Sequence, residues 1–197
     1  FVKNAVVNLG ASYLLFVWVV VVGASNAANL TDGLDGLAIG CTVFVSLAYA
    51  VMAYVTGNSI MSHYLQVFYL PGAGELACFC AALVGAGLGF LWFNSFPATV
   101  FMGDTGSLAI GGAIAIVSVM LKKELLLVIV GGIFVFETAS VIIQVASFKL
   151  TGRRVFLMTP IHHHFQKLGW PESKITIRFW IIAAILALLS MAAFKVM

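Results

Sequence analysis

Long uncharged apolar runs, rather than short alternations of apolar and polar residues, dominate this chain. Six runs have the length of a membrane span, at about residues 5–24, 37–56, 76–93, 107–121, 125–149 and 176–197. A helix needs about 20 mostly apolar residues to cross a bilayer, in which only helices and closed barrels satisfy their own backbone. The pattern predicts an all-α polytopic membrane bundle, in which the short run at 107–121 borrows a turn from its neighbours or does not cross fully.

Composition excludes the soluble classes of protein. Hydrophobic residues make up 62% of the 197 residues and charged residues 9%, with a mean hydropathy of +1.12. A soluble domain is nearer half apolar and about a quarter charged. The three cysteines lie inside apolar runs, which argues against a disulfide framework and a zinc site. We expect an integral membrane protein that has no nucleic-acid partner.

The charges between the runs indicate how the spans are oriented. Six crossings place the loops at 25–36, 94–106 and 150–175 on one face of the membrane. Basic residues on this face number six: Lys149, Arg153, Arg154, Lys167, Lys174 and Arg178. The other face has four: Lys3, Lys122, Lys123 and Lys195. The positive-inside rule makes the first face cytoplasmic, and this face also has every aspartate of the chain, Asp32, Asp35 and Asp104.

The first cytoplasmic loop, NAANLTDGLDGLA at 26–38, has a polar side chain at every third position. Asn26, Asn29, Asp32 and Asp35 are interleaved with glycines, and this spacing turns them toward one side of a helical or tightly turned segment. Amides and carboxylates together suit a base edge or sugar hydroxyls. The alternative is a helix cap, in which one aspartate satisfies the free N–H groups at the start of the second span.

The second loop contains the sequence FMGDTGS. Asp104 lies between two glycines beside a predicted helix N-terminus, where a carboxylate can hold Mg²⁺ while backbone N–H groups face a phosphate. Phe101 is positioned either to stack on a base or to anchor the loop in the bilayer. The alternative for this stretch is again a helix cap, supplied by Asp104 or by Ser107.

The third loop contains PIHHHFQKLGW, with three adjacent histidines that lack the spacing of zinc ligands on a helix. Either His162–His164 form a polar patch for an anionic substrate with the nearby Arg153, Arg154 and Lys167, or they lie on a solvated amphipathic helix. Within the fifth run, Glu137 and Gln144 share one helix face, and Gly131-Gly132 can loosen or bend the helix.

Three stretches, NAANLTDGLDGLA, FNSFPATVFMGDTGSLAIGG and TPIHHHFQKLGW, closely resemble the bacterial phospho-N-acetylmuramoyl-pentapeptide transferases. These enzymes belong to the polyprenyl-phosphate N-acetylhexosamine-1-phosphate transferases. The resemblance implies Mg²⁺-dependent transfer of phospho-MurNAc-pentapeptide from UDP-MurNAc-pentapeptide to undecaprenyl phosphate. The products are lipid I and UMP, formed on the cytoplasmic face of the bacterial inner membrane. The resemblance is also compatible with a homodimer.

The resemblance also implies roles for individual residues. Asp104 corresponds to the magnesium ligand, and the catalytic cleft is implied to contain Asp104, Asp32, Asp35 and Asn94. Substrate contacts are implied for Asn29, Asp32, Asp35, Phe101 as a uracil stacker, Gln144, His162, His163 and His164. Related transferases that use UDP-GlcNAc have a different histidine-rich motif, so the uninterrupted triplet favours the muramoyl-pentapeptide branch over the UDP-GlcNAc branch.

One departure from the family is large. Its members have about ten spans and an Asp-Asp motif in their N-terminal half, and no Asp-Asp pair occurs in these 197 residues. We expect residues 1–197 to be the C-terminal part of one transferase domain, inactive alone. The alternative of a different class is a transporter lined by Glu137 and the glycine-rich spans. Polar residues gather at one face instead of the midplane, which favours the transferase.

Overall fold

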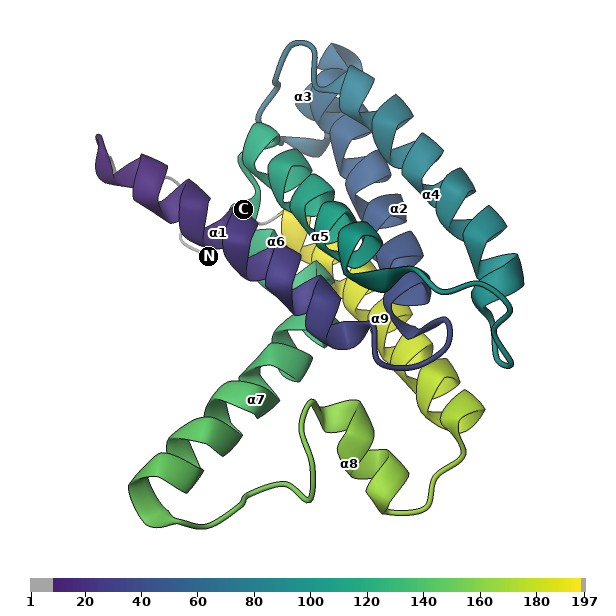
Figure 1. Cartoon of the computed structure of the whole chain (residues 1–197). Helices are drawn as coiled ribbons and strands as arrows, with labels where there is room; N and C mark the ends of the chain where they lie inside the picture. Colours follow the sequence, from purple (N-terminus) through teal and green to yellow (C-terminus); the bar gives the residue numbers. More distant parts are fainter. Residues whose placement is uncertain (1–8, 196–197) are drawn as a thin grey trace.

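The computed structural model describes residues 9–195, and within that range the chain forms nine helices and no strand (Figure 1). Their bounds are α1 (Ser12–Thr31), α2 (Leu37–Gly57), α3 (Ser59–Leu65), α4 (Gly74–Asn94), α5 (Gly103–Met120), α6 (Glu124–Val130), α7 (Gly132–Thr151), α8 (Ile161–Lys167) and α9 (Glu172–Phe194). Six of the described helices, α1, α2, α4, α5, α7 and α9, are long and apolar enough to cross a membrane. The prediction of an all-α polytopic membrane protein is confirmed.

Three predicted span boundaries that fall on described residues are wrong by a turn or more. Helix α1 continues to Thr31 instead of ending at residue 24, α5 begins at Gly103 instead of 107, and α9 begins at Glu172 instead of 176. Polar residues remain helical there because their side chains find helical partners: the Asn26 amide donates to the Val22 carbonyl at 2.8 Å. The predicted loops 25–36 and 94–106 are correspondingly shorter. The predicted start of the first span and end of the last fall on 1–8 and 196–197, outside the described residues.

The predicted fifth span, 125–149, is two helices. Gly131 has a ψ of 21°, far from the helical value, and this break separates α6 from α7. Gly132 then lies directly against α9, where an added Cβ would be 2.8 Å from Leu186 Cδ1. Beyond this contact α7 extends away from the other helices, and the long loop predicted at 150–175 contains the short helix α8 (Figure 1).

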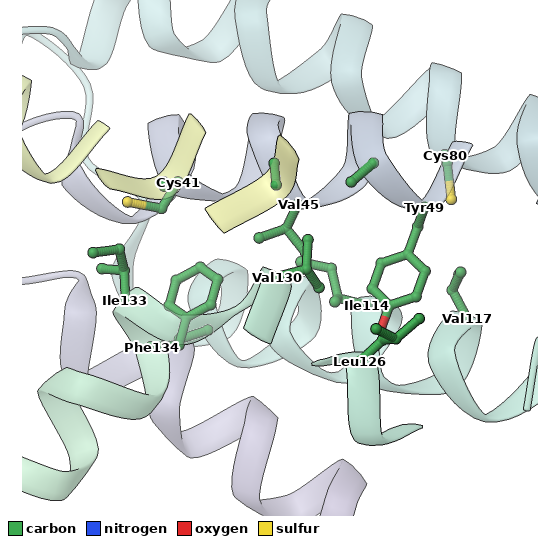
Figure 2. Packing of buried hydrophobic residues seen from close by; sticks show 14 of the residues in the cluster. Cys41, Val45, Tyr49, Cys80, Ile114, Val117, Leu126, Val130, Ile133 and Phe134 are labelled. Atoms are coloured by element: carbon green, nitrogen blue, oxygen red, sulfur yellow. The ribbon is translucent and has the colours of Figure 1, made fainter. Parts of the chain in front are cut away.

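Helix α2 is the centre of the core. Most of its residues are buried, and it packs between α4 and α9. Figure 2 shows the Tyr49 side chain of α2 among apolar residues of α5 and α6, including Val117 and Leu126. The Tyr49 hydroxyl donates to the Lys123 carbonyl at 3.3 Å, so this polar tip finds a partner at the end of the core. The other spans have far more exposed apolar surface, as lipid-facing helices do.

The contact between α1 and α5 sets the geometry of the two helix ends that contain the first two motifs. A Cβ on Gly111 would be 2.5 Å from the Ala24 carbonyl oxygen and 2.7 Å from Ser25 Cα, so only glycine permits this approach. The Ser25 hydroxyl donates to the Leu108 carbonyl at 2.8 Å across the same contact. The C-terminal end of α1 therefore lies beside the N-terminal end of α5, although about 75 residues separate them in sequence.

Candidate functional site

An asparagine of α1 joins the first predicted motif to the second. Asn29 Nδ2 donates to Asp104 Oδ1 at 2.9 Å and to Ser107 Oγ at 3.0 Å. Ser107 is buried one turn inside α5 and accepts this bond, so it is part of the site and not the N-cap of α5. Asp104 is exposed in the first turn of α5, where the free backbone N–H groups and the helix dipole favour an anion. The arrangement holds one oxygen of the Asp104 carboxylate in place.

A second carboxylate lies close enough to Asp104 to interact with it. Burial and the nearby charge of Asp104 raise the pKa of Asp32, which follows the last residue of α1. Two carboxylates that repel each other in a half-buried site are stabilised by a cation between them. The pair Asp32 and Asp104 therefore fits a divalent cation.

The described side chains do not by themselves complete a metal site. Between residues 9 and 195, no group of three His, Cys, Asp or Glu side chains could hold a metal ion. Magnesium commonly uses one or two carboxylates and leaves its other positions to water and substrate phosphates. The carboxylates of Asp104 and Asp32 fit that pattern, and magnesium binding at Asp104 stays a prediction.

Asp35, which was predicted to share one side with the other polar residues of the first loop, makes contacts of its own with other parts of the chain. Its Oδ2 accepts the Ala98 N–H at 2.9 Å, its own N–H donates to Glu172 Oε1 at 2.9 Å, and its carbonyl accepts from Thr176. The helical spacing is lost because α1 ends at Thr31 and Gly36 turns the chain with a φ of +73°. The carboxyl group of Asp35 ties this loop to the 95–102 segment.

The helix-cap alternative for the first loop is wrong. The N-cap of α2 is Gly36, and no side chain caps that helix end. Neither Asp32 nor Asp35 caps α2, so helix capping does not explain why the first loop contains these two carboxylates.

Asn94, predicted as a catalytic residue, has the contacts of a residue that holds the loops together. It is buried, its Oδ1 accepts the Gly36 N–H at 3.1 Å, and its Nδ2 donates to the Val100 carbonyl at 2.8 Å. Trp180 of α9 donates to the Gly36 carbonyl at 3.1 Å. Both peptide groups of Gly36 are thus fixed by side chains from α4 and α9.

Phe101 remains available for a ligand. It lies in the segment before α5, three residues from Asp104, and its side chain is 73% exposed. An exposed ring next to the carboxylates is compatible with either predicted role, base stacking or membrane anchoring.

The predicted uridine-pocket residue Gln144 is engaged by the chain itself. Its Oε1 accepts the Val155 and Phe156 N–H groups at 3.0 and 2.9 Å, and its Nε2 donates to the Phe156 carbonyl at 3.0 Å. Gln144 therefore fastens the 152–160 segment to α7. A cavity of about 360 Å³ beside it is lined by Lys149, Arg154 and apolar side chains, so basic groups lie next to the Gln144 amide.

The first histidine of the triplet is fully buried, which excludes the solvated-helix alternative for it. His162 Nδ1 is 3.1 Å from Glu137 Oε2, and neither side chain is appreciably exposed. The two groups are close but poorly aligned, and neither completes a hydrogen bond in the described structure. On its other side the ring touches the first loop, because a Cβ on Gly33 would be 2.3 Å from His162 Nε2. His162 thus lies between α7 and the Asp32–Asp35 turn.

The other two histidines are partly exposed. His163 Nδ1 is 2.6 Å from Gln166 Oε1, and its ring lies 4.1 Å from the ring of His162. His164 Nδ1 accepts the Leu157 N–H at 3.2 Å, which leaves its Nε2 as the nitrogen that donates in the neutral ring. The three imidazoles therefore differ in environment, and only His163 and His164 can reach a soluble ligand.

Three residues that shape the site were not singled out by the sequence: Ser107 as a partner of Asn29, and Glu172 and Trp180 as partners of the Asp35-Gly36 turn. The last two lie about 140 residues from the groups they contact, so no local pattern points to these contacts.

The family model described as Glycosyl transferase family 4 matches residues 1–122, more than half of the chain. The match includes the first two motifs, with Asn29, Asp32 and Asp104, and ends before Glu137 and the histidines. The chain belongs to glycosyl transferase family 4 and is a membrane-embedded transferase of the polyprenyl-phosphate sugar-phosphate type.

Proposed function

We propose that the complete protein transfers phospho-MurNAc-pentapeptide from UDP-MurNAc-pentapeptide to undecaprenyl phosphate, giving lipid I and UMP at the cytoplasmic face of the bacterial inner membrane. The observation that supports this most is the convergence of the three motifs. Asn29 bonds to Asp104, and His162 packs on Gly33, so segments about 75 and 129 residues apart share one membrane face. The uninterrupted histidine triplet favours the muramoyl-pentapeptide substrate over UDP-GlcNAc.

Asp104 and Asp32 would hold the magnesium ion. When bound, Mg²⁺ neutralises charge on the diphosphate and stabilises the departing UMP. Asn29 orients Asp104 by holding one of its oxygens, which leaves the other oxygen for the ion. The N–H groups in the first turn of α5 face the same region and suit a phosphate oxygen. Positioning and charge neutralisation are the main requirements of phosphoryl transfer, and these residues supply both.

The remaining predicted residues would bind the donor. Phe101 offers an exposed ring for the uracil, and His163 and His164 offer donors to the phosphate or sugar end. Asp35, Asn94 and Gln144 act mainly by holding the loops that surround the donor, because their polar atoms are already bonded within the chain.

The lipid acceptor has a path from the membrane. An apolar groove of about 310 Å³ lies between α1 and α7 and is lined by Val20, Ala27, Phe134, Ile142 and neighbouring side chains. A polyprenyl tail in this groove would bring its phosphate toward the end of α1, where Asn29 and Asp32 lie. The transporter alternative has weaker support, because Glu137 is buried against His162 and lines neither the groove between α1 and α7 nor the cavity beside Gln144.

UMP release by the complete polypeptide, purified in detergent with undecaprenyl phosphate, tests this proposal. We expect release with UDP-MurNAc-pentapeptide but not UDP-GlcNAc, loss of release in EDTA, and a loss of at least about a hundredfold in Asp104→Asn, as expected when charge stabilisation is removed. Glu75→Gln is the matched control, because Glu75 lies in the first turn of α4, at the other end of that helix from Asn94, and this variant should retain activity. Preference for UDP-GlcNAc would contradict the muramoyl assignment, and full activity of Asp104→Asn would contradict the magnesium assignment.

A further inference from the structure

A third cavity, away from Asp32 and Asp104, lies between α7 and α9. The two helices touch where Gly132 meets Leu186 and separate toward the start of α9, leaving a cavity of about 560 Å³. Its wall is almost wholly apolar and includes Phe136, Phe179 and Ile182. Phe136 and Ile182 are about half exposed, so the cavity opens toward the lipid.

Two cations lie over the ring of Trp170, which lines this cavity together with one of them, Arg178. The Arg178 guanidinium lies 4.3 Å, and the Lys174 ammonium 5.2 Å, from the centre of the Trp170 ring. Trp170 is itself fixed by stacking on Phe165, with ring centres 4.8 Å apart. Within residues 9–195, no carboxylate lies within 4.0 Å of either cation. Two positive charges are therefore held over an aromatic platform without a neutralising partner from the described chain.

This cavity is separate from the groove between α1 and α7. At 100° per residue along α7, Gly132 and Phe136 face one side of the helix, whereas Phe134 and Thr138, which line the other groove, face nearly the opposite side. A molecule bound between α7 and α9 would therefore lie on the side of α7 that faces away from α1. It would not compete for the space that the acceptor tail uses.

We propose that this cavity binds an anionic glycerophospholipid, with its phosphate at Arg178 and Lys174 and an acyl chain between α7 and α9. Basic pockets between spans on the cytoplasmic side suit lipid head groups, and tryptophan favours the same interfacial depth. Arg178 lies about 10 Å along α9, and its long side chain can extend to the membrane surface. A free phosphate would use the two charges but not the apolar wall, which makes a lipid the better match.

Native mass spectrometry of the complete protein, titrated with phosphatidylglycerol or phosphatidylcholine, tests this inference. We expect phosphatidylglycerol to bind more tightly. Lys174→Gln and Arg178→Gln should each weaken that binding about fivefold, the usual effect of one basic residue at an anionic surface, without changing phosphatidylcholine binding. Lys167→Gln, an exposed cation on α8, is the matched control and should bind as the wild type does. Ile182→Trp, which narrows the cavity and keeps both charges, should also weaken binding.

Three other outcomes would contradict the assignment of this cavity to an anionic lipid. Equal binding of the two lipids, or unchanged binding in both charge variants and in Ile182→Trp, would overturn the assignment. Displacement of phosphatidylglycerol by millimolar inorganic phosphate would show an anion site without a lipid requirement. Its displacement by equimolar undecaprenyl phosphate would make the cavity an acceptor site instead. If a charge variant fails to fold, Ile182→Trp and the comparison of lipids on the wild type decide the matter.

Discussion

Substitution of Gly33 by alanine tests the contact between the first motif and the histidine triplet. The added Cβ would be 2.3 Å from His162 Nε2 and 2.8 Å from His162 Cε1, far inside van der Waals contact. The imidazole has little room to move, because it is fully buried, faces Glu137 at 3.1 Å and lies against the ring of His163. Either the ring or the Asp32–Asp35 turn must shift by about an ångström.

The magnitude follows from the cost of overpacking. Inserting a methyl group into a well-packed region costs about 1–3 kcal/mol. For a chain of this size that corresponds to an apparent melting temperature lower by roughly 2–12 °C. UMP release should fall as well, since the turn that moves contains Asp32.

The assay compares melting of purified variants in detergent. Gly112→Ala, at an α5 position with nothing within 4 Å of the new Cβ, is the control and should match or slightly exceed the wild type. In the double variant Gly33→Ala/His162→Ala the clash disappears, so the combined loss should be smaller than the sum of the two single losses. A Gly33→Ala protein as stable and active as the wild type, or strictly additive losses, would refute the reasoning.

Further variants probe the rest of the site. The pKa of Asp32 is raised above its ordinary value of 3.8 in the folded protein, so ionisation of this carboxyl group destabilises the fold as pH rises above 3.8. In EDTA, Asp32→Asn should therefore melt higher than the wild type at neutral pH and lose that gain near about pH 3. A gain in melting temperature that persists in acid would contradict this sign. Trp180→Phe removes the bond to the Gly36 carbonyl and should lower the unfolding free energy by about 1 kcal/mol, whereas Trp92→Phe, on the exposed face of α4, should not. Gly111→Ala places a Cβ 2.5 Å from a backbone oxygen and should separate α1 from α5; calorimetry should show weaker Mg²⁺ binding, and unchanged binding would contradict this.

The spans were predictable because hydropathy is a local property of the sequence. The six long apolar helices match the six predicted runs, apart from the ends. The ends were missed where polar residues stay helical through contacts that the sequence does not reveal, as when Asn29 bonds to Asp104 and Ser107. The break at Gly131 was foreseen only as a bend, because two adjacent glycines do not indicate whether a helix curves or stops.

The site was predicted in its parts but not in its arrangement. Spacing singled out Asp32, Asp104 and the histidines, yet it also grouped Asp35 with Asp32, whereas in the structure the Asp35 carboxylate accepts the Ala98 N–H and Asp32 interacts with Asp104. Glu137 was singled out as an acid within the fifth apolar run, but its neighbour His162 belongs to another helix 25 residues away. Such pairings depend on how α7 and α8 fold back on each other, which no periodicity within either helix specifies.

The central place of α2 has a consequence for biosynthesis. Helix α2 enters the membrane about 130 residues before α9. During translation, the side of α2 that packs on α9 therefore stays without its partner until α9 is inserted. Helix α2 lies very close to α9, since a Cβ on Gly40 would be 2.1 Å from Trp180 Nε1. The same Trp180 nitrogen holds the Gly36 carbonyl. The aspartate turn therefore acquires its final shape only when α9 has left the translocon, and nascent chains arrested before α9 should insert without an ordered site.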